Sequence, residues 1–223
     1  IVTEAVLRLV GKPVSQKTFL AAFRSDKDAL RAPIELSRIG IRPSILEFLD
    51  RWTVECVQSF TGKEVFHGIS PHPVLLIELD GDPSLIEKES LQLINWLKES
   101  AICHEVAGTQ EEAEELWDVR RKGSPAMKKL ANTKLNEDVV VPLVEQVNLV
   151  ECVDQLRQQF KLKVGVFGHC GDGNLHVNFM YDHEDEDELL ELDEDEPPAW
   201  AFHFATTPAI PGCSHFHFGA VKG

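Results

Sequence analysis

The sequence predicts an α+β fold in which helices pack on one face of a largely antiparallel sheet. A strand pattern, a helix pattern and a second strand pattern follow one another twice, first over residues 17–49 and then over residues 74–106. The helical stretches carry apolar residues at intervals of three and four, whereas the strands are short apolar or alternating runs. Two consecutive units of this kind favour a ferredoxin-like layering over a doubly wound parallel sheet.

The boundaries of the expected elements come from apolar spacing and from residues that favour helix ends. Gly40 and Gly62 each follow a helical stretch, where glycine readily takes a left-handed cap conformation. Gly123 and Pro125 are expected to interrupt a later helix. The expected helices cover residues 26–39, 50–60, 83–99, 111–130 and 143–160. The expected strands cover residues 2–9, 17–24, 45–49, 74–79, 102–106, 138–141, 163–167 and 175–181.

Composition narrows the classes of function. A chain of 223 residues with 43% apolar residues can bury a substantial core, and no apolar run approaches the roughly 20 residues that span a bilayer. The net charge is −15, but ten of the 37 acidic residues lie within residues 184–196, which leaves 27 acids against 22 bases elsewhere. Without a basic stripe, nucleic acid is not expected as a partner. Five scattered cysteines without a CxxC pair favour a reducing compartment, and the cytoplasm is the expected location.

The motif GHCGDG, residues 168–173, joins two expected strands and carries the clearest chemical signal. Its three glycines permit unusual backbone angles in a tight connection. His169 ends one strand and His176 lies just inside the next, so a hairpin can bring both imidazoles to one mouth. Neutral imidazole is a common ligand for zinc-like metals, although a metal site needs a third ligand. The two histidines therefore belong either to a metal site or to the polar rim of a hairpin.

Two further residues are candidates for substrate binding. Asn178 lies two residues beyond His176 on the same face of the expected strand, so it would point into the same cavity as a hydrogen-bond donor. Arg120 is one of two adjacent arginines that follow Trp117, and its planar guanidinium matches the geometry of a carboxylate. The alternative for Arg120 is an exposed ion pair with the Glu-rich start of its own helix.

The string FGHCGDGNLHVNFM, residues 167–180, closely resembles the GHxGDGNLH signature of the C-terminal domain of FAD-linked oxidases, within the vanillyl-alcohol oxidase group. That family includes FAD-linked subunits of glycolate oxidase, D-lactate dehydrogenases and D-2-hydroxyglutarate dehydrogenase. Further similar segments extend the resemblance over about residues 1–190. They are IVTEAVLRL at 1–9, ILEFLD at 45–50, LLIELDG at 75–81, LWDVRRKGSPA at 116–126 and EDVVVP at 137–142.

The resemblance implies an FAD-dependent oxidoreductase that oxidises a small D-2-hydroxy acid to the 2-oxo acid, by hydride transfer from C2 to the flavin. Matched residue by residue, His169 and His176 correspond to ligands of a divalent metal, zinc or manganese. Arg120 and Asn178 correspond to groups that bind the substrate. An upstream domain would hold the FAD, and an electron acceptor protein or a quinone would reoxidise it. The chain by itself is then an inactive fragment, and the alternative is a non-catalytic module that binds metal or carboxylate.

The sequence departs from the family pattern after Leu190. Relatives continue with a GEHGxGxxK-like motif, which supplies a Glu metal ligand and a His base, but alignment on the last Gly and Lys puts His215 and Phe216 in those two positions. The catalytic base therefore stays unassigned. A shifted reading frame, a truncation or a recombination would each explain the change. We expect a substrate- and metal-binding cap domain over residues 1–183 and an acidic, irregular tail over residues 184–223.

Overall fold

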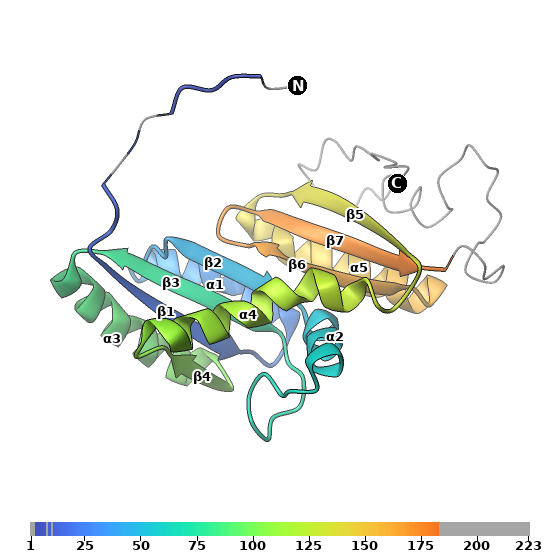
Figure 1. Cartoon of the computed structure of the whole chain (residues 1–223), viewed down its shortest axis with the longest axis horizontal. Coiled ribbons are helices and arrows are strands. Elements are labelled where there is room, and N and C mark those ends of the chain that lie inside the picture. Colours follow the sequence, from blue (N-terminus) through green and yellow to red (C-terminus); the bar gives the residue numbers. More distant parts are fainter. Residues whose placement is uncertain (1–2, 8, 10, 183–223) are drawn as a thin grey trace.

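A computed structural model describes residues 3–7, 9 and 11–182, and the core of this part of the chain is one antiparallel sheet. Its seven strands have the order β4-β1-β3-β2-β6-β7-β5, and all neighbours are antiparallel. The strands are β1 (Ser15–Ala22), β2 (Ile45–Leu49), β3 (Val74–Gly81), β4 (Cys103–Val106), β5 (Thr133–Val140), β6 (Lys163–His169) and β7 (Asn174–Tyr181). The helices are α1 (Asp26–Arg38), α2 (Arg51–Thr61), α3 (Pro83–Ser100), α4 (Gln110–Met127), η1 (Leu143–Glu145) and α5 (Gln146–Phe160). The α+β class with a largely antiparallel sheet is confirmed (Figure 1).

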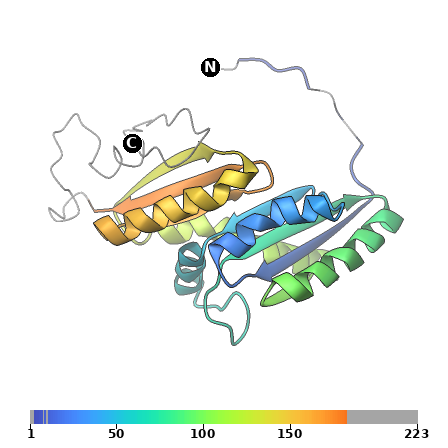
Figure 2. The same ribbon diagram turned by 180° about the vertical axis from the view of Figure 1, so that it is seen from behind.

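Helices cover both faces of the sheet. On one face α1, α3 and α5 pack over the larger buried cluster, which includes Phe19, Leu36 and Leu149 (Figure 2). On the other face α4 runs across the sheet with α2 against it, over a smaller cluster that includes Leu76 and Phe167 (Figure 1). Three helices thus follow the expectation of helices on one face, and the placement of α2 and α4 corrects it. Apolar spacing shows that a helix has a buried side but not which face of the sheet that side meets.

Local capping explains where several helices begin and end. Asp50 begins α2 and accepts a hydrogen bond from a backbone amide of the first turn. Gly62 ends the same helix in the left-handed conformation, as the sequence indicated. The predicted interruption of α4 at Gly123 and Pro125 is wrong, because the helix continues to residue 127. Gly123 is buried against α2 and β6, so packing keeps this stretch helical despite its low intrinsic propensity.

The predicted strand over residues 2–9 does not form in the part of it that the structure describes. These residues have no regular secondary structure and run away from the sheet (Figure 1). Val6 is 95% exposed and Leu7 is 78% exposed. A strand needs a neighbouring backbone for its amides and carbonyls, and no described strand pairs with this segment. Alternating apolar residues were therefore insufficient evidence for this element.

Two further features of the described residues are the state of the cysteines and the apolar content of the helices. Four cysteines lie within the described residues, and all four are free thiols. Burial raises the pKa of Cys56 to about 12, so this thiol stays protonated at neutral pH. Searched over the same residues, no helix has the combination of length and apolar content that a bilayer crossing requires.

A short ladder between β2 and β6 joins the two parts of the sheet. In its register Glu47 faces His169. Asp50 follows β2 directly, and its fully buried carboxylate accepts a hydrogen bond from the backbone amide of Val166 at 2.9 Å. Arg157 of α5 forms an ion pair with the same carboxylate. Asp50 therefore fixes β6, α2 and α5 against one another, and its charge is compensated inside the core.

Two glycines of the GHCGDG motif have backbone conformations that other residues disfavour. Gly168 has φ 153° and Gly173 has φ 86°. A β carbon on Gly173 would lie 2.1 Å from the carbonyl oxygen of Val141, and one on Gly168 would lie 2.7 Å from the carbonyl oxygen of Asn174. The tight β6–β7 connection that the sequence predicted therefore depends on the missing side chains as well as on the backbone angles.

We expect Gly173→Ala to lower the free energy of unfolding by about 3 kcal/mol, because the added methyl group meets a carbonyl and the backbone is also strained. Gly62→Ala is the matched control, since its φ is 67° but nothing lies within 4 Å of the added carbon. The control is expected to cost only about 1 kcal/mol. Urea denaturation followed by circular dichroism measures both losses. Equal losses would contradict the close approach of Gly173 to Val141.

Candidate functional site

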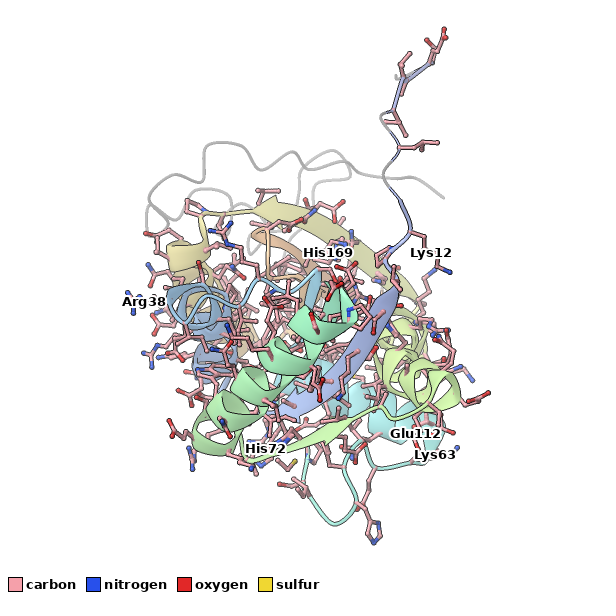
Figure 3. All side chains as sticks on the ribbon, turned by 90° about the vertical axis from the view of Figure 1, so that its left-hand side faces the viewer. Lys12, Arg38, Lys63, His72, Glu112 and His169 are labelled. Carbon is pink, nitrogen blue, oxygen red and sulfur yellow. The ribbon has the colours of Figure 1, made fainter. Side chains whose placement is uncertain are left out.

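The candidate site lies on the α4 face of the sheet, where β2 begins and β6 turns into β7. A cavity of about 480 Å³ opens there. Figure 3 shows His169 at this end of the sheet, opposite the end where His72 lies. Segments far apart in the sequence converge on the cavity. Its lining residues are Pro43, Ser44, Ile45, Leu46, Glu47, Trp117, Arg120, Arg121, His169, Gly171 and Asp172.

Glu47 is the centre of the polar contacts in this cavity. Its side chain is 4% exposed and lies between Arg120 and His169. Oε2 of Glu47 accepts a hydrogen bond from Nε of Arg120 at 2.5 Å, and Oε1 contacts Nδ1 of His169. Burial removes the solvation free energy of a carboxylate. Here both oxygens have polar partners, which compensate for that loss. Glu47 was not among the residues predicted from the sequence, although a lone acid within the apolar strand ILEFL is a usable signal.

His176 is held in a similar way from the neighbouring strand β5. Its Nδ1 contacts Oδ1 of Asp138, which faces it across the β5–β7 ladder. The rings of His169 and His176 are 5.9 Å apart between centroids and lie edge to face. The structure therefore brings the two histidines together at one end of the hairpin, as the sequence indicated. Asp138 was missed as a partner, because the register of β5 against β7 is not visible in local spacing.

Both histidines have the arrangement that is typical of metal ligands. A ligating imidazole usually donates its second N–H to a carboxylate, which fixes the tautomer and the orientation of the ring. With Nδ1 engaged in this way, Nε2 of His169 and of His176 is available to a ligand. Over the described part of the chain, no group of three His, Cys, Asp or Glu side chains is placed to hold a metal ion. Among the described residues, a metal at this position would therefore have two imidazole ligands and would need further ligands from elsewhere.

Asn178 is fully buried beside His176 on β7. Its Nδ2 donates to the carbonyl oxygen of Gly165 at 3.3 Å and to that of His176 at 3.1 Å. Its Oδ1 is buried without a hydrogen-bond partner among the described residues. The sequence suggested a donor at this position, and the structure corrects that detail, because the free atom is an acceptor. This carbonyl oxygen can accept a hydrogen bond from a hydroxyl group or contact a cation.

Arg120 and Arg121 have different environments although they are adjacent. Arg120 is 16% exposed and pairs with Glu47, and its guanidinium carbon lies 4.6 Å from the centre of the Phe167 ring. Arg121 is 50% exposed and pairs with two acids of its own helix. The alternative of an exposed ion pair on the helix therefore applies to Arg121. Arg120 is the more deeply buried of the two arginines in the cavity lining.

Lys134, which was not predicted from the sequence, is a second cation that packs against the ring of Phe167. Nζ of Lys134 lies 5.7 Å from the centre of that ring and 2.8 Å from Oγ of Ser124. Burial, together with a smaller effect of Lys128, lowers the pKa of Lys134 to about 8. An anion bound beside the charged amine would offset this loss of solvation. Arg120 and Lys134 form a cationic pair over Phe167, and this ring is itself 5.6 Å from that of His176.

We expect a carbon-13 NMR titration, with the signal assigned through Lys134→Met, to give Lys134 a pKa of about 8. Oxalate, a small carboxylate anion, should raise this pKa if it binds at the cationic pair. A pKa that oxalate leaves unchanged would contradict an anion site there.

The same pKa predicts a pH dependence of stability. The charged amine costs folding free energy below pH 8, and the cost disappears as the pH rises from 8 toward the ordinary value of 10.5. Lys134→Met should therefore unfold at a higher urea concentration than the unmodified chain at pH 7, and this advantage should shrink above pH 8. An advantage that is independent of pH would indicate a gain in packing instead.

Comparison with known proteins gives a match over most of the chain. The family model described as FAD linked oxidases, C-terminal domain, matches residues 12–195. A glycolate oxidase subunit from Bacillus subtilis is 32% identical over 195 residues, which cover 87% of this chain and 41% of that protein. A mitochondrial D-lactate dehydrogenase (cytochrome) from Arabidopsis thaliana is 26% identical, covering 86% of this chain and 34% of that protein. A D-2-hydroxyglutarate dehydrogenase from Xanthomonas citri is 27% identical, covering 81% of this chain and 38% of that protein. The chain thus spans about two fifths of the length of these relatives.

Solved structures with the same fold are flavoenzymes of the vanillyl-alcohol oxidase type. p-Cresol methylhydroxylase has a TM-score of 0.58 at 12% identity, covering 79% of this chain and 41% of that chain. 4-Ethylphenol oxidase from Gulosibacter chungangensis has a TM-score of 0.51 at 13% identity, covering 82% of this chain and 42% of that chain. At this level of identity the likeness concerns the fold.

Proposed function

Since the chain belongs to the family of C-terminal domains of FAD-linked oxidases, we propose that it is the substrate- and metal-binding part of an FAD-dependent oxidoreductase. The proposed reaction oxidises a D-2-hydroxy acid, of the glycolate or D-lactate type, to the 2-oxo acid. One observation carries the proposal beyond the family. The cationic pair over Phe167 lies beside two histidines that carboxylates hold in place, on one face of one sheet. A carboxylate and the hydroxyl group next to it require these two kinds of partner side by side.

Arg120 and Lys134 bind the substrate carboxylate in this proposal. Glu47 engages Nε of Arg120, which orients the guanidinium and leaves its terminal nitrogens for a ligand. A carboxylate takes two parallel hydrogen bonds from such a fork, whereas the amine of Lys134 contributes a point charge. Both cations lie against the ring of Phe167, which helps to hold their charged groups in place before a substrate binds.

His169 and His176 would hold a divalent metal, zinc or manganese, through their Nε2 atoms. Glu47 and Asp138 fix the two rings through Nδ1, and the free Oδ1 of Asn178 lies on the same strand as His176. This donor set fits a metal, because neutral imidazoles with carboxylate partners are typical ligands of such ions. When bound, the metal would stabilise negative charge on the substrate hydroxyl oxygen as its proton leaves.

The residues of this chain position the substrate for hydride transfer. A bound flavin would accept the hydride from C2, which protein side chains cannot do. The cationic pair fixes the carboxylate and the histidines fix the hydroxyl group, so the orientation of C2 is determined from two sides. The base that removes the hydroxyl proton is not assigned, and the expected alignment positions His215 and Phe216 lie outside the described residues.

The whole enzyme is proposed to extend beyond the part that this chain provides. We assign the FAD to a separate domain, because the relatives are more than twice as long as the matching segment. The cap domain would cover residues 1–183. The tail over residues 184–223 and its predicted boundary lie outside the described residues. An electron acceptor protein or a quinone would reoxidise the flavin, and the cytoplasm remains the expected location.

We expect Arg120→Lys, in the enzyme assembled with its flavin domain, to raise the KM for D-lactate by about 30-fold, because a charge-assisted hydrogen bond to the carboxylate is lost. Arg31→Lys is the matched control and should leave KM unchanged, since Arg31 lies outside the cavity and pairs with Asp28 on the surface of α1. Steady-state kinetics with an artificial electron acceptor measure both. An unchanged KM in Arg120→Lys would remove Arg120 from the substrate site.

Metal binding is tested through the residue that orients His169. Glu47→Gln is expected to weaken zinc binding by about 10- to 100-fold, as for other lost carboxylate partners of ligating histidines. Competition with a fluorescent chelator gives the affinity of the assembled enzyme, and manganese is measured in the same way. Asp118→Asn, an exposed change on α4, is the control. Equal affinities in both variants and the unmodified enzyme would exclude the histidine pair as the metal site.

A further inference from the structure

A second cavity of about 400 Å³ lies beside the first, under the N-terminal half of α4. It is called here the Glu78 cavity, and the residues that matter are Gln16, Thr18, Glu78, Gln110, Glu114 and Trp117. We propose that this cavity receives the far end of the substrate and selects 2-hydroxy acids whose far end is uncharged, against dicarboxylates. The inference rests on the proposed function and deepens it by naming the substrate class.

The two cavities are neighbours on the same face of the sheet. Trp117 lines both of them. Glu78 of β3 faces Ile45 of β2, and Glu47 lies two residues further along β2 on the same face. Diagonal neighbours of this kind are about 7–8 Å apart, so the far end of an extended substrate of about five carbons can reach from one cavity to the other.

Glu78 gives the second cavity a negative charge that the described residues do not compensate. The side chain is 3% exposed. Its carboxylate accepts hydrogen bonds from Nε1 of Trp117 at 3.1 Å, from Oγ1 of Thr18 at 3.2 Å and from Nε2 of Gln16. All three donors are neutral, and no basic residue lines the cavity within the described part of the chain. The carboxylate of Glu78 therefore borders a cavity whose described lining holds acidic and neutral side chains but no basic one.

The face of the sheet is therefore polarised along its length. Arg120 and Lys134 supply positive charge at one end, and Glu78 supplies negative charge at the other. Trp117, one helical turn before Arg120, lines both cavities, so the rest of a substrate whose carboxylate is bound by the cations can extend past Trp117 toward Glu78. A second carboxylate there would meet the charge of Glu78, and the donors of Trp117 and Thr18 are already used. A hydroxyl or amide group would instead donate a hydrogen bond to Glu78.

The test uses the enzyme assembled with its flavin domain and compares kcat/KM for D-lactate and D-glycerate with those for D-malate and D-2-hydroxyglutarate. We expect the monocarboxylates to be preferred. Glu78→Gln keeps the shape and removes the charge, so it should raise the ratio of D-2-hydroxyglutarate to D-lactate oxidation by about tenfold. Glu111→Gln removes one charge from the first turn of α4 outside the cavity and should leave this ratio unchanged.

Gln16→Lys is the second variant, because Gln16 is exposed at the rim and tolerates a longer side chain. It places a cation beside Glu78, and the same shift toward dicarboxylates is expected even if Glu78→Gln does not fold. A dicarboxylate preference in the unmodified enzyme, or an unchanged ratio in Gln16→Lys, would overturn the selection by Glu78 while leaving the proposed reaction intact. Failure to oxidise any 2-hydroxy acid would instead overturn the proposed function, and the inference with it.

Discussion

The pairing of β2 with β6 is the constraint on which the rest of the structure depends. Only three residue pairs form this ladder, yet it joins four strands on one side to three on the other. Asp50 strengthens the join by binding the amide of Val166 and pairing with Arg157. The same ladder sets Glu47 opposite His169, so the contact that holds the sheet together also orients the candidate ligand. A shift of one residue would turn Glu47 to the α5 face and separate the two groups.

Two acids are buried on the α4 face of the sheet, and each lines one of the two cavities. Glu47 and Glu78 are both almost fully buried, and a core of this size gains stability from apolar groups rather than from carboxylates. Glu47 is compensated by Arg120 and His169, whereas Glu78 has only neutral donors. Stability alone does not explain an uncompensated buried acid next to an open cavity. The proposed recognition of a substrate would account for an acid at this position.

Much of the fold was visible in the sequence, but the partners within the site were not. The strand ends around GHCGDG, the two histidines and the position of Arg120 followed from glycine chemistry, spacing and family resemblance. Glu47 lies 122 residues before His169, and Asp138 lies 38 residues before His176. Strand order and register bring these pairs together, and local periodicity contains neither. Lys134 was missed for the same reason, because only its packing over Phe167 sets it apart from other lysines.

The continuity of α4 sets the distance between the Glu78 cavity and the cations over Phe167. Trp117, Arg120 and Ser124 follow one another at intervals of three and four, so they lie on one side of the helix. They contact Glu78, Glu47 and Lys134 in turn. A break at Gly123, as its composition suggested, would separate Ser124 from this row. At a rise of 1.5 Å per residue the row is about 10 Å long. One unbroken helix thus covers both the cationic pair and the Glu78 cavity, and a molecule bound beneath it meets opposite charges at its two ends.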